Sequence, residues 1–160
     1  MKTRKNKGFG LVEVLVAGGV LAMSLLGISA YYQQSLRVSQ TALHTTQAAF
    51  LLDEGIEAVR ILRDVHWSNI SGLVAGTPYY LVWNGTTWAT TTTSSLVEGL
   101  FDRTIVVADV NRDLNDDIVT SGGTTDTGIR KATVTVTWDE RGSTITKTAS
   151  MYISNLFDLI

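Results

Sequence analysis

Residues 9–32 decide the fold of this chain, because they read FGLVEVLVAGGVLAMSLLGISAYY and contain one side chain that is charged at neutral pH, Glu13. As an α-helix rising about 1.5 Å per residue, this run spans ~36 Å, enough to cross the ~30 Å hydrocarbon layer of a membrane with some tilt. Tyr31 and Tyr32 close the run at the height where aromatic side chains meet a membrane surface. A chain of 160 residues has too small an interior to cover such a helix, so we expect it to enter a membrane.

A basic cluster precedes the apolar run. The charged side chains within residues 1–8 are all basic, namely Lys2, Arg4, Lys5 and Lys7. The positive-inside rule therefore keeps this end in the cytoplasm and places everything after Tyr32 on the outer side. Without the cluster, nine basic side chains face 15 acidic ones, a formal charge of −6. That acidic balance predicts no contact with nucleic acid.

Composition alone favours two ordinary explanations of residues 1–32, a cleaved secretory signal or a plain membrane anchor. Two details oppose a conventional signal peptide, since the apolar run exceeds the usual ~7–15 residues and lacks a clear small-x-small cleavage site after it. A plain anchor does not account for Glu13, because an acidic side chain costs about 2.5–3.5 kcal/mol near the centre of a membrane helix and remains unfavourable nearer its end. An acid inside a membrane is a candidate functional residue.

The segment KGFGLVEVL at positions 7–15 resembles the processing signal of type IV prepilins and pseudopilins. The shared features are a short basic leader, a glycine, an aromatic residue, a long apolar helix and a glutamate at its fifth position. Gly10 departs from the pattern, because the family usually has Thr or Ser there, and we expect glycine to weaken the first helical turn. The run from Glu13 to Ser35 looks most like minor pilins and pseudopilins, with Ala30 where many major pilins have a kinking proline. The resemblance covers roughly the first 65 residues.

The resemblance implies how the amino terminus is processed and used. Prepilin peptidase would cut between Gly8 and Phe9 and methylate the new amino group of Phe9. Glu13 would then pair with the ammonium of Phe9 in a neighbouring subunit and set the axial register, since a buried carboxylate without a partner is strongly disfavoured. Small residues such as Gly18 and Gly19, with Ala22, would let neighbouring helices approach closely.

The implied partners are prepilin peptidase, other pilin or pseudopilin subunits, the inner-membrane assembly machinery and the lipid bilayer. The implied location is the cytoplasmic (inner) membrane, crossed once with the head outside, followed by an extracellular filament at the cell surface.

Helical periodicity continues to about Val65, without a proline and with Gly55 as its weak point. On a helical wheel the charged residues form one stripe, namely Asp53, Glu57, Arg60 and Asp64. The opposite side is apolar and contains Leu51, Ala58, Leu62 and Val65. We interpret the charged stripe as a solvated face rather than a subunit contact.

Beyond a polar loop at 66–76 the apolar period changes from 3.6 to 2, which indicates strands. Segments 79–83 and 86–90 predict a hairpin with a two-residue type I′ turn at Asn84 and Gly85. Further strands are predicted at 101–108, 131–138 and 144–153, the last two joined through 138–143. Segments 90–93 and 121–128 are predicted to be surface loops.

These elements predict an α+β fold, in which a long N-terminal and partly transmembrane spine helix packs on a small antiparallel β-sheet head, as in pilins. The expected organisation is a cleaved basic leader at 1–8, a membrane or filament-core half of the helix at 9–32, an amphipathic half at 33–66 and a globular head at 67–160.

A calcium site is the one metal site that the sequence suggests. Oxygen-bearing side chains alternate along one stretch, at Asp109, Asn111, Asp113, Asn115 and Asp117, and calcium prefers such hard ligands. The stretch lacks two parts of an EF-hand loop, since Leu114 replaces the turn glycine and Thr120 replaces the bidentate glutamate. Asx residues also cap turns on their own account, so a polar loop between two strands is the alternative. No other cofactor is expected.

No motif in the sequence predicts an enzyme. The chain has no cysteine and only two histidines, His44 and His66, and it lacks a phosphate-binding glycine loop and an HExxH motif. We expect a structural subunit, most similar to a minor pilin, that assembles into a type IV pilus or related filament. A pseudopilin of a type II secretion or DNA-uptake system is the first alternative. A membrane-anchored adhesin or binding module that never polymerises, with Trp83 and Trp88 at a hairpin tip as a contact, is the second.

Overall fold

The computed structural model describes residues 10–156, and a single long helix dominates it. Helix α1 runs without interruption from Leu11 to Val65 and is followed by the short helix α2, Ser68–Ser71. The helix persists because its sequence contains no proline. The chain divides into two compact units between Leu43 and His44, so the last part of α1 belongs with the sheet.

The rest of the described chain forms one antiparallel sheet. Its strands are β1 (Pro78–Trp83), β2 (Trp88–Thr91), β3 (Leu96–Val97), β4 (Phe101–Arg112), β5 (Ile118–Val119), β6 (Thr124–Glu140) and β7 (Ser143–Ser154). The order across the sheet is β2-β1-β4-β6-β7, and the short strands β3 and β5 both pair with β4. The fold is therefore α+β, with a long N-terminal helix and a small antiparallel sheet, as the sequence predicts.

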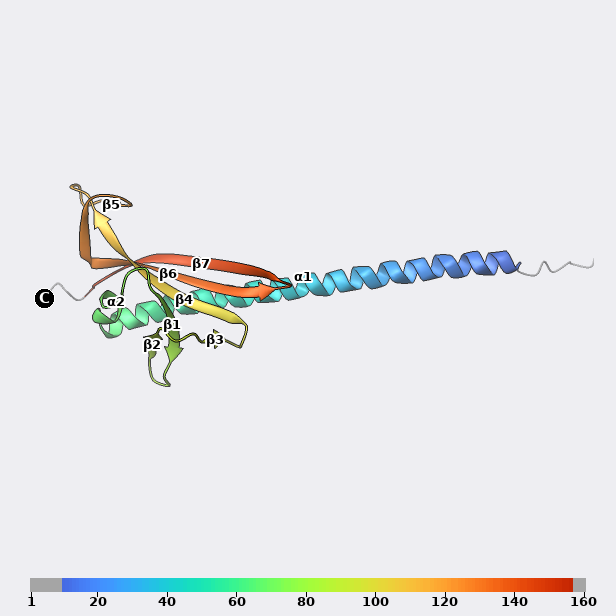
Figure 1. Cartoon of the computed structure of the whole chain (residues 1–160), viewed down its shortest axis with the longest axis horizontal. Helices are drawn as coiled ribbons and strands as arrows, with labels where there is room; N and C mark the ends of the chain where they lie inside the picture. Colours follow the sequence, from blue (N-terminus) through green and yellow to red (C-terminus); the bar gives the residue numbers. More distant parts are fainter. Residues whose placement is uncertain (1–9, 157–160) are drawn as a thin grey trace, which may run out of the picture. The chain divides into compact units, whose positions relative to one another are not determined.

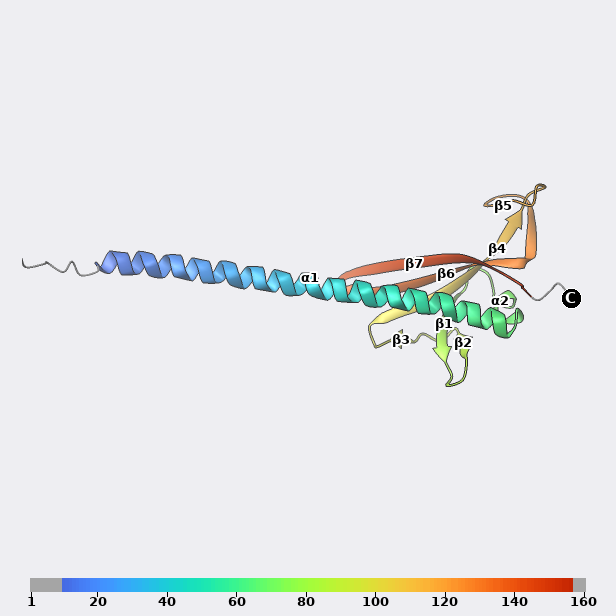
Figure 2. The same ribbon diagram turned by 180° about the vertical axis from the view of Figure 1, so that it is seen from behind.

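Helix α1 packs on the sheet through its residues beyond His44. Figures 1 and 2 show β6 and β7 running alongside this part of α1. The helix contributes small and aliphatic buried residues, namely Ala48, Gly55, Ala58, Val59 and Leu62. The predicted alternation in β6 is confirmed, because its apolar members are buried, namely Ala132, Val134, Val136 and Trp138. Val65, expected on the apolar side, is 60% exposed because the helix ends there, beyond its contact with the sheet.

The β6–β7 hairpin is the longest regular pairing in the molecule and confirms the hairpin predicted through 138–143. Its register runs without a shift from Glu140 opposite Ser143 to Ile129 opposite Ser154. The connecting residues Arg141 and Gly142 have φ values of 54° and 81°. Two positive φ values are the signature of the type I′ turn, whose twist suits a two-residue hairpin.

The β1–β2 hairpin differs from its prediction. Trp83 pairs with Trp88, so the loop contains four residues rather than two, and of these only Gly85 has a positive φ. Asn84 instead caps the loop, because its side-chain oxygen accepts the N–H groups of Thr86 and Thr87 at 3.0 and 2.9 Å. The two-residue type I′ turn was the wrong prediction, because the asparagine side chain replaces the tight backbone turn.

A β-bulge bends the far end of the sheet into an arm, which we define as residues 110–126. Asp109 faces Arg130 but Val110 faces Asp126, so β6 has three extra residues at this point. Beyond the bulge the end of β4, strand β5 and the start of β6 turn away from the rest of the sheet (Figure 1). Part of the predicted loop 121–128 is therefore strand, and so is part of 90–93, because β2 includes Thr90 and Thr91.

Candidate functional site

The candidate processing and assembly site lies at the start of α1. Gly8 and Phe9, the predicted cleavage and methylation residues, lie outside the described residues. Gly10 precedes the first helical residue, and its carbonyl oxygen accepts the N–H groups of Glu13 and Val14 at 3.0 and 3.3 Å. Gly10 thus occupies the N-cap position, where glycine is well tolerated, and the expected weakening of the first turn does not apply there.

Glu13 closes the same cap from the other side. Its Oε2 atom accepts the backbone N–H of Gly10 at 3.0 Å, which is the reach-back bond of a capping box. Within residues 10–156 its second oxygen, Oε1, has no hydrogen bond. Glu13 can therefore hold the helix start and still accept a hydrogen bond from an ammonium group.

The surface around Glu13 is apolar and uncovered. Every residue from Gly10 to Leu43 is exposed, and the large apolar side chains nearest Glu13 are 60–81% exposed, namely Leu11, Val12, Val14, Leu15 and Val16. By length and composition α1 contains one segment able to cross a membrane, and none of that segment is buried within the chain. Such a surface needs lipid or other protein around it, because water does not stabilise an exposed apolar helix.

Among residues 10–156, nothing packs against the glycines of this segment. A Cβ added at Gly18, Gly19 or Gly27 would meet nothing within 4 Å, and none of the three has a positive φ. Each glycine lowers helix stability by about 0.8–1.0 kcal/mol relative to alanine. Close approach by another helix is the usual compensation for small residues in membrane helices.

The predicted calcium ligands are spread over a strand and a turn, and the first two have protein partners. Asp109 forms an ion pair with Arg130 beside the bulge. Asn111 donates through Nδ2 to the carbonyl oxygen of Gly122 at 2.9 Å and accepts from Thr125 through Oδ1 at 3.0 Å.

The remaining three predicted ligands lie in the turn between β4 and β5. Asp113 caps this turn, because its Oδ1 atom accepts the N–H groups of Asn115 and Asp117 at 2.8 and 3.0 Å. Asp116 at the same tip has a φ of 68°. Within the described chain no group of three or more His, Asp or Glu side chains is placed to hold a metal ion. Calcium binding stays a prediction that titration of the chain with calcium would test.

Arg112 on β4 links the strands of the arm, because it bonds both Asp126 on β6 and the turn before β5. Its Nε atom lies 2.7 Å from Oδ2 of Asp126, and its Nη1 atom donates to the carbonyl oxygen of Asp116 at 2.7 Å. The hydrogen bond from Arg112, together with the N–H of Gly128, lowers the pKa of Asp126 below its usual 3.8. The same hydrogen bond to Asp126 raises the pKa of Arg112 above its ordinary value. The arm is therefore held by charge at the pH of a cell.

Arg103 is a buried cation that the sequence analysis missed. It lies on the core-facing side of β4 and is 4% exposed. Its Nη1 atom bonds Oε2 of Glu54 on α1 at 2.7 Å, and its guanidinium carbon lies 5.4 Å from the ring centre of Trp88 on β2. Arg103 thus ties the helix to two strands. The available signal was a charge at a position where alternation within β4 calls for an apolar residue.

The histidines and tryptophans singled out in the sequence have structural contacts. His44 is half-buried, with its ring at 86° to that of Phe101 and the ring centres 6.2 Å apart. Trp83 is 55% exposed and meets Trp88 edge-on with ring centres 5.6 Å apart.

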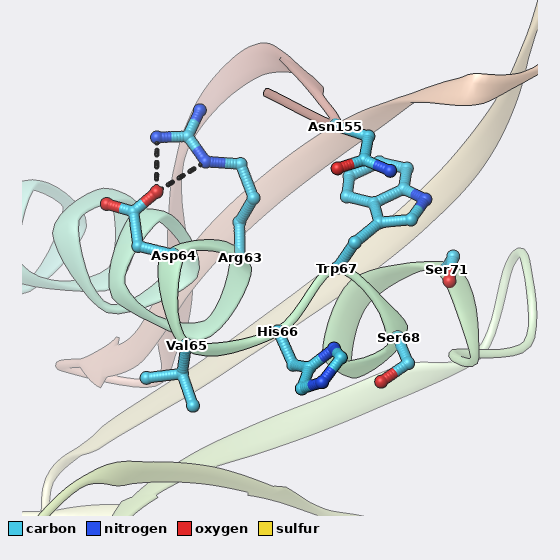
Figure 3. Close-up of a pocket in the computed structure, with 8 residues that line it drawn as sticks. All are labelled: Arg63, Asp64, Val65, His66, Trp67, Ser68, Ser71 and Asn155. Atoms are coloured by element: carbon cyan, nitrogen blue, oxygen red, sulfur yellow. Dashed lines mark hydrogen bonds and ion pairs between the residues drawn. The ribbon is translucent and has the colours of Figure 1, made fainter. Parts of the chain in front are cut away.

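His66 lies in a cavity of about 600 Å³ at the C-terminal end of α1, with Trp67 and Asn155 also in its lining. Figure 3 shows this cavity, in which the Arg63 guanidinium is already paired with Asp64 at 2.8 Å.

Comparison of the chain with protein-family models, with curated proteins and with solved structures found no match.

Proposed function

We propose that this chain is a prepilin-type structural subunit, most similar to a minor pilin, which is cut by prepilin peptidase and assembles into a type IV pilus or related filament. The observation that carries the proposal is Glu13, the one acid in the exposed part of α1 from Leu11 to Leu43. A plain anchor has no need for this acid, whereas a filament subunit uses it to pair with the freed terminus of its neighbour.

The geometry of the helix start is compatible with that pairing. Glu13 uses one carboxylate oxygen for the N–H of Gly10 and leaves the other for a second donor. An ammonium created at Phe9 of a neighbouring subunit would supply that donor and a compensating positive charge. Subunits entering with the wrong stagger would leave both charges unpaired in an apolar environment, which is strongly unfavourable.

The exposed glycines of the N-terminal part of α1 support the proposal that neighbouring helices pack against each other. Gly18, Gly19 and Gly27 have open space around them in the described part of the chain, so their small size serves no contact with it. In a filament core they would allow neighbouring α1 helices to approach closely, as small residues do between membrane helices. The segment would then exchange lipid for protein of similar polarity without passing through water.

A pseudopilin of a type II secretion or DNA-uptake system would use the same spine, and it remains the first alternative. The second is a membrane-anchored adhesin or binding module that does not polymerise, for which the half-exposed Trp83 would be a contact.

The mature amino terminus tests the proposal. Mass spectrometry of the chain purified from membranes is expected to find Phe9 as the first residue, with a methylated amino group. Replacing Gly8 by leucine is expected to block the cut, because a large side chain would precede the scissile bond, whereas Gly10→Ala is the matched control and should be cut normally. A mature chain that keeps residues 1–8 would contradict the proposal and favour the anchored binding module.

A further inference from the structure

Strand β7 is a long free edge of the sheet. It contains 12 residues, Ser143–Ser154, and among the described residues it pairs only with β6. The opposite edge, β2, has four residues. An unpaired edge strand offers a row of backbone donors and acceptors to another strand.

The backbone groups that face outward can be assigned from the two ends of the hairpin. The two-residue turn makes Glu140 and Ser143 a hydrogen-bonded pair. At the other end Asn155 donates its N–H to the carbonyl oxygen of Gly128 at 2.8 Å, which fits the same alternation. Odd-numbered residues of β7 therefore bond to β6. Even-numbered residues turn their N–H and C=O groups away from the sheet, namely Thr144, Thr146, Thr148, Ser150 and Tyr152.

This edge lacks two of the features that normally prevent strand addition, a proline and a bulge, although it carries a third, a single lysine. β7 contains no proline, and its register with β6 contains no bulge. Its one charged side chain, Lys147, lies opposite the buried Val136 and so extends from the helix-facing side of the sheet. The other side presents exposed hydroxyl-bearing residues, which pair well across strands.

We propose that β7 pairs antiparallel with β7 of a second copy of this chain, with the two Thr148 residues facing each other on the two-fold axis. In this register Thr146 faces Ser150 and Thr144 faces Tyr152. On the other side of the sheet Ile145 faces Met151, an apolar pair, and Lys147 faces Ala149. A register shifted by two residues toward the hairpin turn would set Lys147 against Lys147, and like charges directly opposite each other are destabilising.

The proposed contact goes beyond assembly of one filament. Antiparallel pairing turns one head end for end relative to the other, so the contact joins copies that point in opposite directions. Subunits of one filament point the same way, and the contact therefore links copies from two filaments or from two opposed surfaces. One strand pair is smaller than a standard protein interface and binds weakly, but repeated display of the head would raise its avidity.

Cysteine cross-linking of the full chain in detergent tests the register, because the natural sequence has no cysteine to interfere. In Thr148→Cys the two Cα atoms would be about 5.5 Å apart, within the ~4.4–6.8 Å that a disulfide requires. In Thr144→Cys, the matched control, they would be offset by eight residues, or about 27 Å. Mild oxidation is expected to give at least tenfold more covalent dimer with Thr148→Cys. A mixture of Thr146→Cys and Ser150→Cys chains should also cross-link.

A second pair of variants tests the association itself. Thr148→Lys would set two cations against each other on the axis, and sedimentation equilibrium is expected to show dimerisation weakened at least tenfold. Thr104→Lys adds the same charge to the same face two strands inward, and it should change the dissociation constant less than twofold. Three results would overturn the proposal: a chain that stays monomeric, equal cross-linking at positions 144 and 148, or undiminished dimerisation of Thr148→Lys. Each would mean that β7 of a second copy does not occupy this edge in the proposed register. None of these outcomes bears on whether Phe9 is the mature terminus.

Discussion

The two halves of α1, residues 11–43 and 44–65, are equally helical, but they differ in what surrounds their side chains. From Leu11 to Leu43 every side chain is exposed, whereas five residues between Ala48 and Leu62 are buried on the sheet. The second half is stabilised by packing within its own chain. Within residues 10–156 the first half has no buried residue, so its apolar side chains are available to lipid or to other molecules. The difference teaches that one continuous helix can combine a folded part with a part whose apolar surface is complete only in an assembly or a membrane.

The glycines of α1 show the same contrast. Gly55 is buried, and a Cβ placed on it would lie 2.6 Å from Cγ1 of Val134 on β6. Gly18 and Gly19 have nothing within 4 Å of such an atom. Gly55 is therefore required by the packing of α1 on β6, whereas our proposal assigns the other two to contacts with neighbouring helices.

Glu13→Ala tests the exposed half of α1 and should have the largest effect of these substitutions, a loss of incorporation into filaments. Membrane insertion should be unchanged or slightly easier, because a polar group leaves the apolar run. Incorporation into filaments should fall more than about tenfold, because the ammonium at Phe9 would lose its buried partner. Immunoblots of sheared filaments against membranes measure the ratio, with Glu57→Ala on the exposed face of the second half as control. Incorporation at wild-type levels would show that the acid does not set the register.

Gly55→Ala tests the half of α1 that packs on the sheet, and Gly19→Ala tests the half that is exposed. The added methyl group must displace Val134, and such overpacking costs about 1–3 kcal/mol, which lowers the melting temperature of the head by several degrees. Gly19→Ala is the matched control, and it should leave head melting unchanged while lowering incorporation into filaments. Calorimetry of both variants gives the comparison. Equal melting of Gly55→Ala and wild type would mean that the helix and sheet separate easily at this contact.

Comparing Glu54→Ala with Glu57→Ala distinguishes an ion pair with a buried arginine from a solvated ion pair on the same helix. Glu54 pairs with the buried Arg103, and its loss should cost about 1–3 kcal/mol because the guanidinium loses its charged acceptor. Glu57 pairs with Arg60 where both side chains are about half exposed or more, so its loss should cost about 0.2–0.5 kcal/mol. Urea unfolding of the two variants measures the difference. A larger loss of unfolding free energy with Glu57→Ala than with Glu54→Ala would contradict the assignment of Glu54 to the buried ion pair and of Glu57 to the solvated one.

Asp126→Asn gives the smallest expected effect and extends the comparison to the arm beyond the bulge. The pKa of Asp126 is lowered in the folded chain, so its charge contributes stability above the unfolded-state pKa near 3.8, and the contribution disappears as the pH falls through the lower folded value. Asp126→Asn should therefore melt below wild type at neutral pH, and the gap should close under acid conditions. Thermal melts between pH 7 and pH 2 check this, and a gap that is constant with pH would indicate a role other than charge.

Much of the fold could be predicted from periodicity. The α1 helix, the alternation of Ala132 to Trp138 and the β6–β7 hairpin all follow from local patterns, because side-chain period alone distinguishes helix from strand. The loop after Trp83 could not be predicted in detail, because Asn84 can either adopt a positive φ itself or cap the turn with its side chain. The bulge after Asp109 was hidden as well, since register depends on contacts between strands and not on either strand alone.

The candidate site was only partly accessible to sequence reasoning. Glu13 stood out because a single charge in an apolar run is conspicuous, and its cap on Gly10 follows from its position three residues later. Arg103 was missed because its partners, Glu54 and Trp88, lie 49 and 15 positions away in the chain. The predicted calcium stretch looked uniform in sequence, yet the fold divides it between β4 and a capped turn.

The sequence by itself determined the apolar N-terminal segment of the helix with its single acid, the strand periodicity and the α+β class, because these depend on the order of apolar and polar residues along the chain. Only the tertiary structure decided that Gly55 lies against Val134 of β6, that Arg103 is buried, and that β7 is an open edge among the described strands. These features depend on which distant segments meet, and long-range contact is set by packing of the whole chain rather than by any local pattern.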